Sequence, residues 1–148
     1  MAMAAGTCRY TPAAPLLRDL AERPIKATTL YLALGDAIVR LGVAQEGTRE
    51  SISWCLSRHN PMLADGAFRA VAMLHLTPAS EVIDMILDHV QPLAPSNGLR
   101  FWPTAAAAGW SATRVRAFLK ECATSPQAGL VHTALASLDG KHQKHHLL

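Results

Sequence analysis

The sequence contains few aromatic and few charged residues. Aromatic residues make up 5% and charged residues 17% of its 148 positions, whereas half of all residues are hydrophobic. A chain this apolar can bury a sizeable core, so the composition excludes disorder over most of the length. The length itself fits one domain.

Cysteine and long apolar runs are also scarce. The three cysteines, Cys8, Cys55 and Cys122, are too widely spaced for a disulfide framework or a paired zinc motif, and Cys55 and Cys122 are expected in the core. No apolar run approaches the roughly 20 residues that span a bilayer, and the first residues do not resemble a signal peptide. We therefore expect no membrane association and a cytoplasmic location.

Motifs that carry catalysis are missing. The sequence has no Gly-x-Ser-x-Gly, His-Glu-x-x-His, glycine-rich phosphate loop or carboxylate cluster. A hydrolase would need a nucleophile, a base and an orienting group brought together. His59, His75 and His89 lie at or beside apolar helical faces, which favours hydrogen-bonded structural histidines. We expect no enzyme activity and no cofactor.

Positive charge gathers in the C-terminal third. Up to Asn97 there are eight Lys or Arg against nine Asp or Glu, a net charge of −1, and from there on six against two, a net charge of +4. The tail, residues 140–148, carries His142, His145 and His146, whose spacing would suit a transition metal on one helix face. Its terminal position favours a frayed basic tail instead, so no metal site is predicted.

Helix signals dominate, and strand signals are nearly absent. Leu30, Leu34, Ala37, Ile38 and Leu41 follow one face of a helix that Gly42 is expected to end. Thr48 is expected to cap the next helix, and Thr77 a later one with Pro78 at its first position. The other predicted helices are 63–75, 99–108, 111–122 and 127–138, and the longest break is 91–98.

Four segments share a register. "DAIVRLG", "RAVAMLH", "TAAAAGW" and "TALASLD" have alanine at the second position, and their offsets are 33, 35 and 29 residues along the chain. The first three are each followed by a short link and another helix. Hairpins that recur at such intervals are typical of an α-solenoid, because each hairpin buries its apolar face on its neighbours. The four shared alanines are Ala37, Ala70, Ala105 and Ala134.

On these segments, residues 25–139 resemble the HEAT-like helical repeat family. The "A-x-x-x-L" pattern at 37–41, 70–74 and 134–138 carries the resemblance, and the third unit departs from it at Pro103 and Gly109. The resemblance implies an all-α fold, a short α-α superhelix of about three helical hairpins plus a terminal helix. Residues 1–24 would form an N-terminal segment with a short helix. The family provides interaction surfaces and no particular chemistry, so it implies a non-catalytic scaffold or adaptor.

Residues 104–121 also fit a DNA-binding helix-turn-helix. Ala108, Gly109, Ser111 and Val115 occupy the positions of the turn and of the recognition helix. Arg114 and its neighbours would then face the major groove. Pro103 leaves the supporting helix short, and the repeat register explains the same residues. A protein partner is therefore favoured over nucleic acid.

The predicted partner-binding surface combines the scarce aromatic residues with the basic ones, because Trp and Arg are enriched at binding hot spots. Its members are Trp102, Trp110, Arg114, Arg116 and Lys120. A second prediction is homodimerisation through the apolar last helix. The residues expected to form that patch are Leu130, Val131, Leu135 and Leu138.

Overall fold

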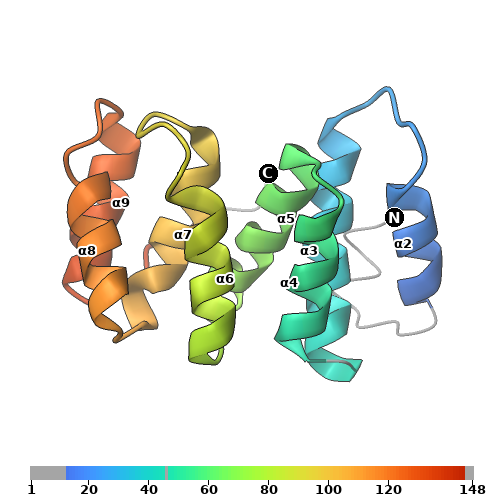
Figure 1. Ribbon diagram of the computed structural model, residues 1–148, viewed down its shortest axis with the longest axis horizontal. Coiled ribbons are helices and arrows are strands. Elements are labelled where there is room, and N and C mark those ends of the chain that lie inside the picture. Colours follow the sequence, from blue (N-terminus) through green and yellow to red (C-terminus); the bar gives the residue numbers. More distant parts are fainter. Residues whose placement is uncertain (1–12, 46, 146–148) are drawn as a thin grey trace. The chain divides into compact units, whose positions relative to one another are not determined.

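A computed structural model of the chain describes residues 13–45 and 47–145, and all regular structure in these residues is helical (Figure 1). The predicted all-α class is confirmed for this part of the chain. No helix in it combines the length and apolar character needed to cross a bilayer. The helices are α2 (Ala14–Ala21), α3 (Thr29–Gln45), α4 (Thr48–Ser57), α5 (Pro61–Met73), α6 (Ser80–Val90), α7 (Phe101–Ala106), α8 (Thr113–Cys122) and α9 (Ala128–Leu138), with short 3-10 turns η2 (Gly98–Arg100) and η3 (Ala107–Gly109).

The chain divides into two compact units, residues 1–70 and 71–148. Unit 1 contains α2, α3, α4 and most of α5, and unit 2 contains α6 to α9. The four alanines of the shared register lie on α3, α5, α7 and α9, and all four are buried.

In unit 1, α3 packs against both α2 and α4, so the first predicted hairpin forms. The expectation that Gly42 ends α3 is wrong, because the helix continues to Gln45. A β-carbon on Gly42 would collide with the side chain of Ser51 on α4. This glycine therefore lets α3 and α4 approach closely.

A pair of glycines brings α3 against α5. A β-carbon on Gly35 would overlap the carbonyl oxygen of Leu63, and one on Gly66 would overlap that of Leu32. Each glycine thus lies on the backbone of the other helix. The two helices make backbone contact that no larger residue would permit.

A buried carboxylate also joins these two helices. Asp36 is fully buried and accepts hydrogen bonds from Arg40 Nε at 2.5 Å and from Arg69 Nη1 at 2.9 Å. Asp36 and Arg69 precede the shared alanines of α3 and α5. A buried charge is tolerated when it is paired and hydrogen-bonded, and Asp36 meets both conditions.

Helix starts differ from the prediction at three places. Gly47, at φ 85°, precedes α4, so Thr48 is its first residue instead of its cap. Asn60 caps α5, since its Oδ1 accepts from the backbone N–H groups of Met62 and Leu63, and α5 begins two residues earlier than expected.

The third difference is at α6, which begins at Ser80. Thr77 and Pro78 remain in the link, because the first turn forms on the carbonyl of Ala79, which accepts from Val82 and Ile83. The expectation that Thr77 caps this helix is wrong.

In unit 2, α9 packs against both α7 and α8. Ser137 Oγ on α9 donates to the carbonyl oxygen of Thr104 on α7 at 2.7 Å, and both residues are buried. Pro103 lies in the first turn of α7, where its missing N–H costs nothing. The last helix is thus the common packing partner of the two before it.

Candidate functional site

The candidate site begins with α8, whose apolar stripe faces the core as predicted. Val115, Phe118, Leu119 and Cys122 are buried at intervals of three and four residues. Trp110 and Ala112 have extended backbone, which turns the chain from η3 into α8. This arrangement puts the other face of α8 in solvent.

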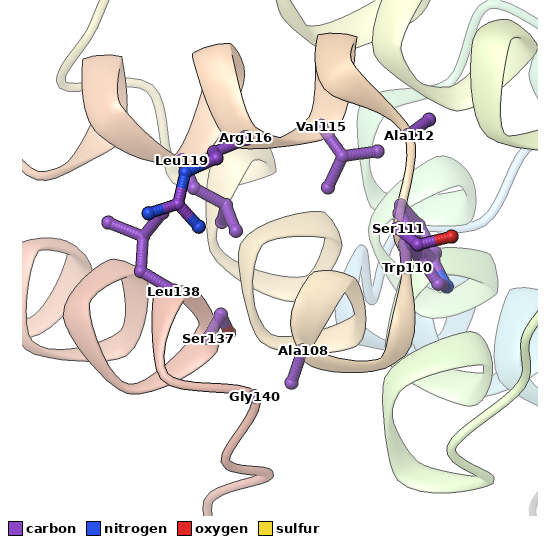
Figure 2. Close-up of a pocket in the computed structure, with 10 residues that line it drawn as sticks. All are labelled: Ala108, Trp110, Ser111, Ala112, Val115, Arg116, Leu119, Ser137, Leu138 and Gly140. Atoms are coloured by element: carbon purple, nitrogen blue, oxygen red, sulfur yellow. The ribbon is translucent and has the colours of Figure 1, made fainter.

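A small groove lies beside this helix, with a volume of about 160 Å³. Figure 2 shows how the turn before α8, α8 itself and the end of α9 enclose it. Pockets for small metabolites usually measure about 300–1,000 Å³, so this groove suits one side chain of a partner. Its lining residues are Ala108, Trp110, Ser111, Ala112, Val115, Arg116, Leu119, Ser137, Leu138 and Gly140.

Arg116 is the one charged residue that lines the groove. Its side chain extends from α8 toward Leu138 on α9 (Figure 2). Arg116 is exposed, and the described part of the chain gives it neither an ion pair nor a hydrogen-bond partner. A guanidinium with five N–H donors is therefore available beside the groove.

Arg114, two residues earlier, is fully engaged. It donates to Asp84 Oδ1 at 3.1 Å, to Asp88 Oδ1 at 2.5 Å and to Gln91 Oε1 at 2.7 Å. The hydrogen bond to Asp88 raises the pKa of the Arg114 guanidinium above its ordinary value. Arg114 thus links α8 to α6 within unit 2.

The two tryptophans of the predicted surface are separated by burial. Trp110 is only 7% exposed, and its Nε1 donates to the carbonyl oxygen of Leu76 at 3.0 Å. Trp102 is half-buried and meets the rings of Phe101 and His145 edge-on. Lys120 is exposed one turn beyond Arg116 and does not line the groove. Of the five predicted residues, the structure brings Trp110 and Arg116 to one site.

Arg100 has a role that the sequence did not reveal. Arginine is usually a surface residue, yet Arg100 is 1% exposed. Its Nη2 donates to the carbonyl oxygens of Gln91 and Leu93, both at 2.8 Å, and its Nη1 donates to Glu121 at 2.9 Å. Arg100 therefore organises the break at 91–98 and holds it against α8.

The apolar face predicted on α9 is only partly exposed. Leu130 belongs to the core, which corrects its place in the predicted patch. Leu135 is 52% exposed, and Val131 and Leu138 are half-buried. Leu138 also lines the groove, so one residue of this face belongs to the groove as well.

The metal-ligating side chains of the described residues do not gather at one point. No group of three or more His, Cys, Asp or Glu side chains in residues 13–45 and 47–145 is arranged to hold a metal ion. Cys55 and Cys122 are buried as predicted, and burial raises the pKa of the Cys55 thiol to about 12. Cys8 and His146 lie outside the described residues.

Comparison with known proteins adds no assignment. No family model matches the sequence, and no curated protein or solved structure shows detectable similarity to it.

Proposed function

We propose that the chain is a non-catalytic scaffold or adaptor with a HEAT-like repeat architecture, which binds a protein partner in the cytoplasm. The observation that carries the proposal is the unpaired Arg116 beside the groove between α8 and α9. Rigid helices present this surface, which lowers the entropy cost of binding.

The chemistry of the groove specifies what the partner must offer. Val115, Leu119 and Leu138 contribute the apolar part of the lining, and the exposed guanidinium of Arg116 can pair with an anion next to it. A carboxylate forms strong charge-assisted hydrogen bonds with arginine. The partner segment is therefore an apolar residue beside Asp or Glu, and its flanks lie on the exposed Leu135 face.

Site-specific crosslinking tests this proposal. Ser111 is exposed and lines the groove, so a photoreactive amino acid at this position should crosslink the partner, which mass spectrometry then identifies. The same probe with Arg116→Glu should lose the crosslink. The matched control is Arg49→Glu, which makes the same charge change at an exposed residue of unit 1 and should keep it.

Three outcomes distinguish the alternatives. Equal crosslinking with and without Arg116→Glu would contradict the proposed site. Crosslinks to a second copy of the chain would replace the partner by the homodimer predicted for α9. Crosslinks to nucleic acid would favour the helix-turn-helix alternative at residues 104–121.

A further inference from the structure

The chain doubles back after α9. Gly140 adopts a left-handed φ of 72°, and the N–H of Lys141 donates to the carbonyl oxygen of Ala136 at 2.9 Å, which closes the helix in a Schellman motif. Thr133 Oγ1 on α9 then donates a hydrogen bond to Gln143 Oε1 at 2.9 Å. Residues 141–145, here called the C-terminal strap, thus lie against their own unit.

Histidine rings make the other contacts of the strap. His142 stacks on His75 with a centroid distance of 4.0 Å and an interplanar angle of 15°. His145 meets Trp102 edge-on at 5.0 Å and Phe101 at 5.7 Å. The link after α5 and the start of α7 therefore hold the strap through imidazole rings.

The charges around these rings have one sign. A cavity of about 450 Å³ under the strap is lined by the three histidines and Lys144, together with neutral residues and no carboxylate. Lys141 adds a further positive charge at the start of the strap, and Asp139 precedes it in the sequence. On the side of α7, Arg100 is already bound to Glu121. No carboxylate in the cavity lining compensates a charge on His142 or His145.

We propose that the C-terminal strap is a pH-sensitive closure, held shut by neutral His142 and His145 and released when they are protonated. A charged His142 would lose hydration where its ring stacks on His75 at 4.0 Å, and a charged His145 would lose hydration against the rings of Trp102 and Phe101. Nε2 of His145 is buried without a hydrogen-bond partner, so a second proton there would have no acceptor.

The direction of titration agrees with this arrangement. Burial, and then the neighbouring His75, lower the pKa of both His142 and His145 from the ordinary 6.5. The folded strap therefore binds fewer protons than a detached one. Its contacts are complete above pH 6.5 and are lost as the pH falls through the lowered values.

The same histidines are poorly placed to bind a metal ion. The lone pairs of imidazole lie in the ring plane, and the nearly parallel rings of His75 and His142 direct them side by side instead of toward one point. Among the described residues, no three or more His, Cys, Asp or Glu side chains are grouped so that they could hold a metal ion. A closure that depends on ring contacts explains the geometry better.

Strap release also bears on the groove. Gly140, the residue before the strap, lines the groove between α8 and α9. His142 of the strap lies over Gly109 in the turn before α8. An effect of pH on partner binding rests on the proposed function, whereas the opening of the strap itself does not.

Backbone order parameters measured by NMR between pH 7.5 and 5 test the closure without any partner. Residues 141–145 should have values near those of rigid backbone, about 0.85, at pH 7.5 and below about 0.6 at pH 5, while α9 stays rigid. The double variant His142→Phe/His145→Phe keeps aromatic rings that cannot be protonated. Its strap should stay rigid at pH 5, and His132→Phe, at an exposed residue of α9, should behave like the unmodified chain.

Three results would overturn the proposal. The strap could have the same order at both pH values, the double variant could loosen at the same pH as the unmodified chain, or one equivalent of Zn²⁺ could bind saturably to His142 and His145. Retained rigidity in the double variant together with loosening of the His132→Phe control would support it.

Discussion

Both units bury a charged side chain completely, but they satisfy it in different ways. In unit 1, Asp36 lies between Arg40 and Arg69, so charges of opposite sign meet and hold α3 against α5. In unit 2, Arg100 donates mainly to backbone carbonyls of the break at 91–98 and reaches one carboxylate, that of Glu121. The first network joins two helices, whereas the second shapes an irregular segment and holds it against α8.

Removing the carboxylate of unit 1 should have the largest effect. Asp36→Ala leaves Arg40 and Arg69 without their buried counter-charge, and we expect the free energy of unfolding to fall by about 3–5 kcal/mol. Urea unfolding followed by circular dichroism measures the change. A loss below about 1 kcal/mol would show that water replaces the ion pairs.

Breaking the network of unit 2 should cost less. Arg100→Met fills much of the same volume but leaves the carbonyls of Gln91 and Leu93 without donors, so we expect a loss of about 2–3 kcal/mol. Arg100→Lys is the control, and it should recover only part of this loss because one ammonium cannot reproduce the forked geometry. Full recovery with lysine would mean that the charge alone matters.

A second carboxylate of unit 1, that of Asp65, sharpens the comparison, because one of its oxygens lacks the hydrogen bonds that Asp36 accepts. Oδ1 of Asp65 is buried without a hydrogen-bond partner, and burial raises the pKa of this carboxyl from 3.8 to about 6, against the opposing effect of Arg69. Between these two pH values the folded chain holds a proton that the unfolded chain has released. The contribution of Asp65 to the free energy of unfolding therefore decreases as the pH rises from 4 to 6.

Asp65→Asn should remove this decrease and stabilise the chain at pH 7 by about 1–2 kcal/mol, a figure reduced for the partial exposure of the side chain. The measurement is the difference in unfolding free energy between the variant and the unmodified chain at pH 4, 5, 6 and 7. A difference that does not grow with pH would contradict the expected titration.

The smallest expected effect is that of Arg114→Ala on DNA binding. Arg114 is already bound to Asp84 and Asp88, whose negative charges also repel phosphate, so α8 is poorly prepared to read a duplex. We expect weak, sequence-independent binding, with no specific loss in Arg114→Ala. Fluorescence anisotropy of labelled duplexes at several salt concentrations measures it. Sequence-selective binding that Arg114→Ala abolishes would make the helix-turn-helix interpretation correct.

The spacing of hydrophobic residues predicted those features of the fold that depend on the local sequence pattern. The buried stripe of α8 and the burial of the shared alanines could be predicted because helical periodicity places those residues on one face. The burial of Asp36 and Arg100 could not be predicted, because charged residues are usually exposed. One partner of each also lies far away in the sequence, Arg69 33 positions from Asp36 and Glu121 21 positions from Arg100. The role of Gly42 could not be predicted for a similar reason. This glycine makes room for Ser51 of the next helix, and the sequence does not show that contact.

The candidate site was predictable only in part. Composition pointed to Trp110 and Arg116, but the acidic residues of α6 that occupy Arg114 become visible only when the helices pack. Two arginines of α8 therefore differ: Arg114 is bound within unit 2, whereas Arg116 is exposed and is the residue proposed to meet a partner.

The most direct test is the dissociation constant of the crosslinked partner for the unmodified chain and for Arg114→Ala and Arg116→Ala, each measured by calorimetry on folded protein. Arg116→Ala should weaken binding at least tenfold, which corresponds to about 1.4 kcal/mol, and Arg114→Ala should change it by less than about twofold. Equal or reversed effects of the two substitutions would contradict the account.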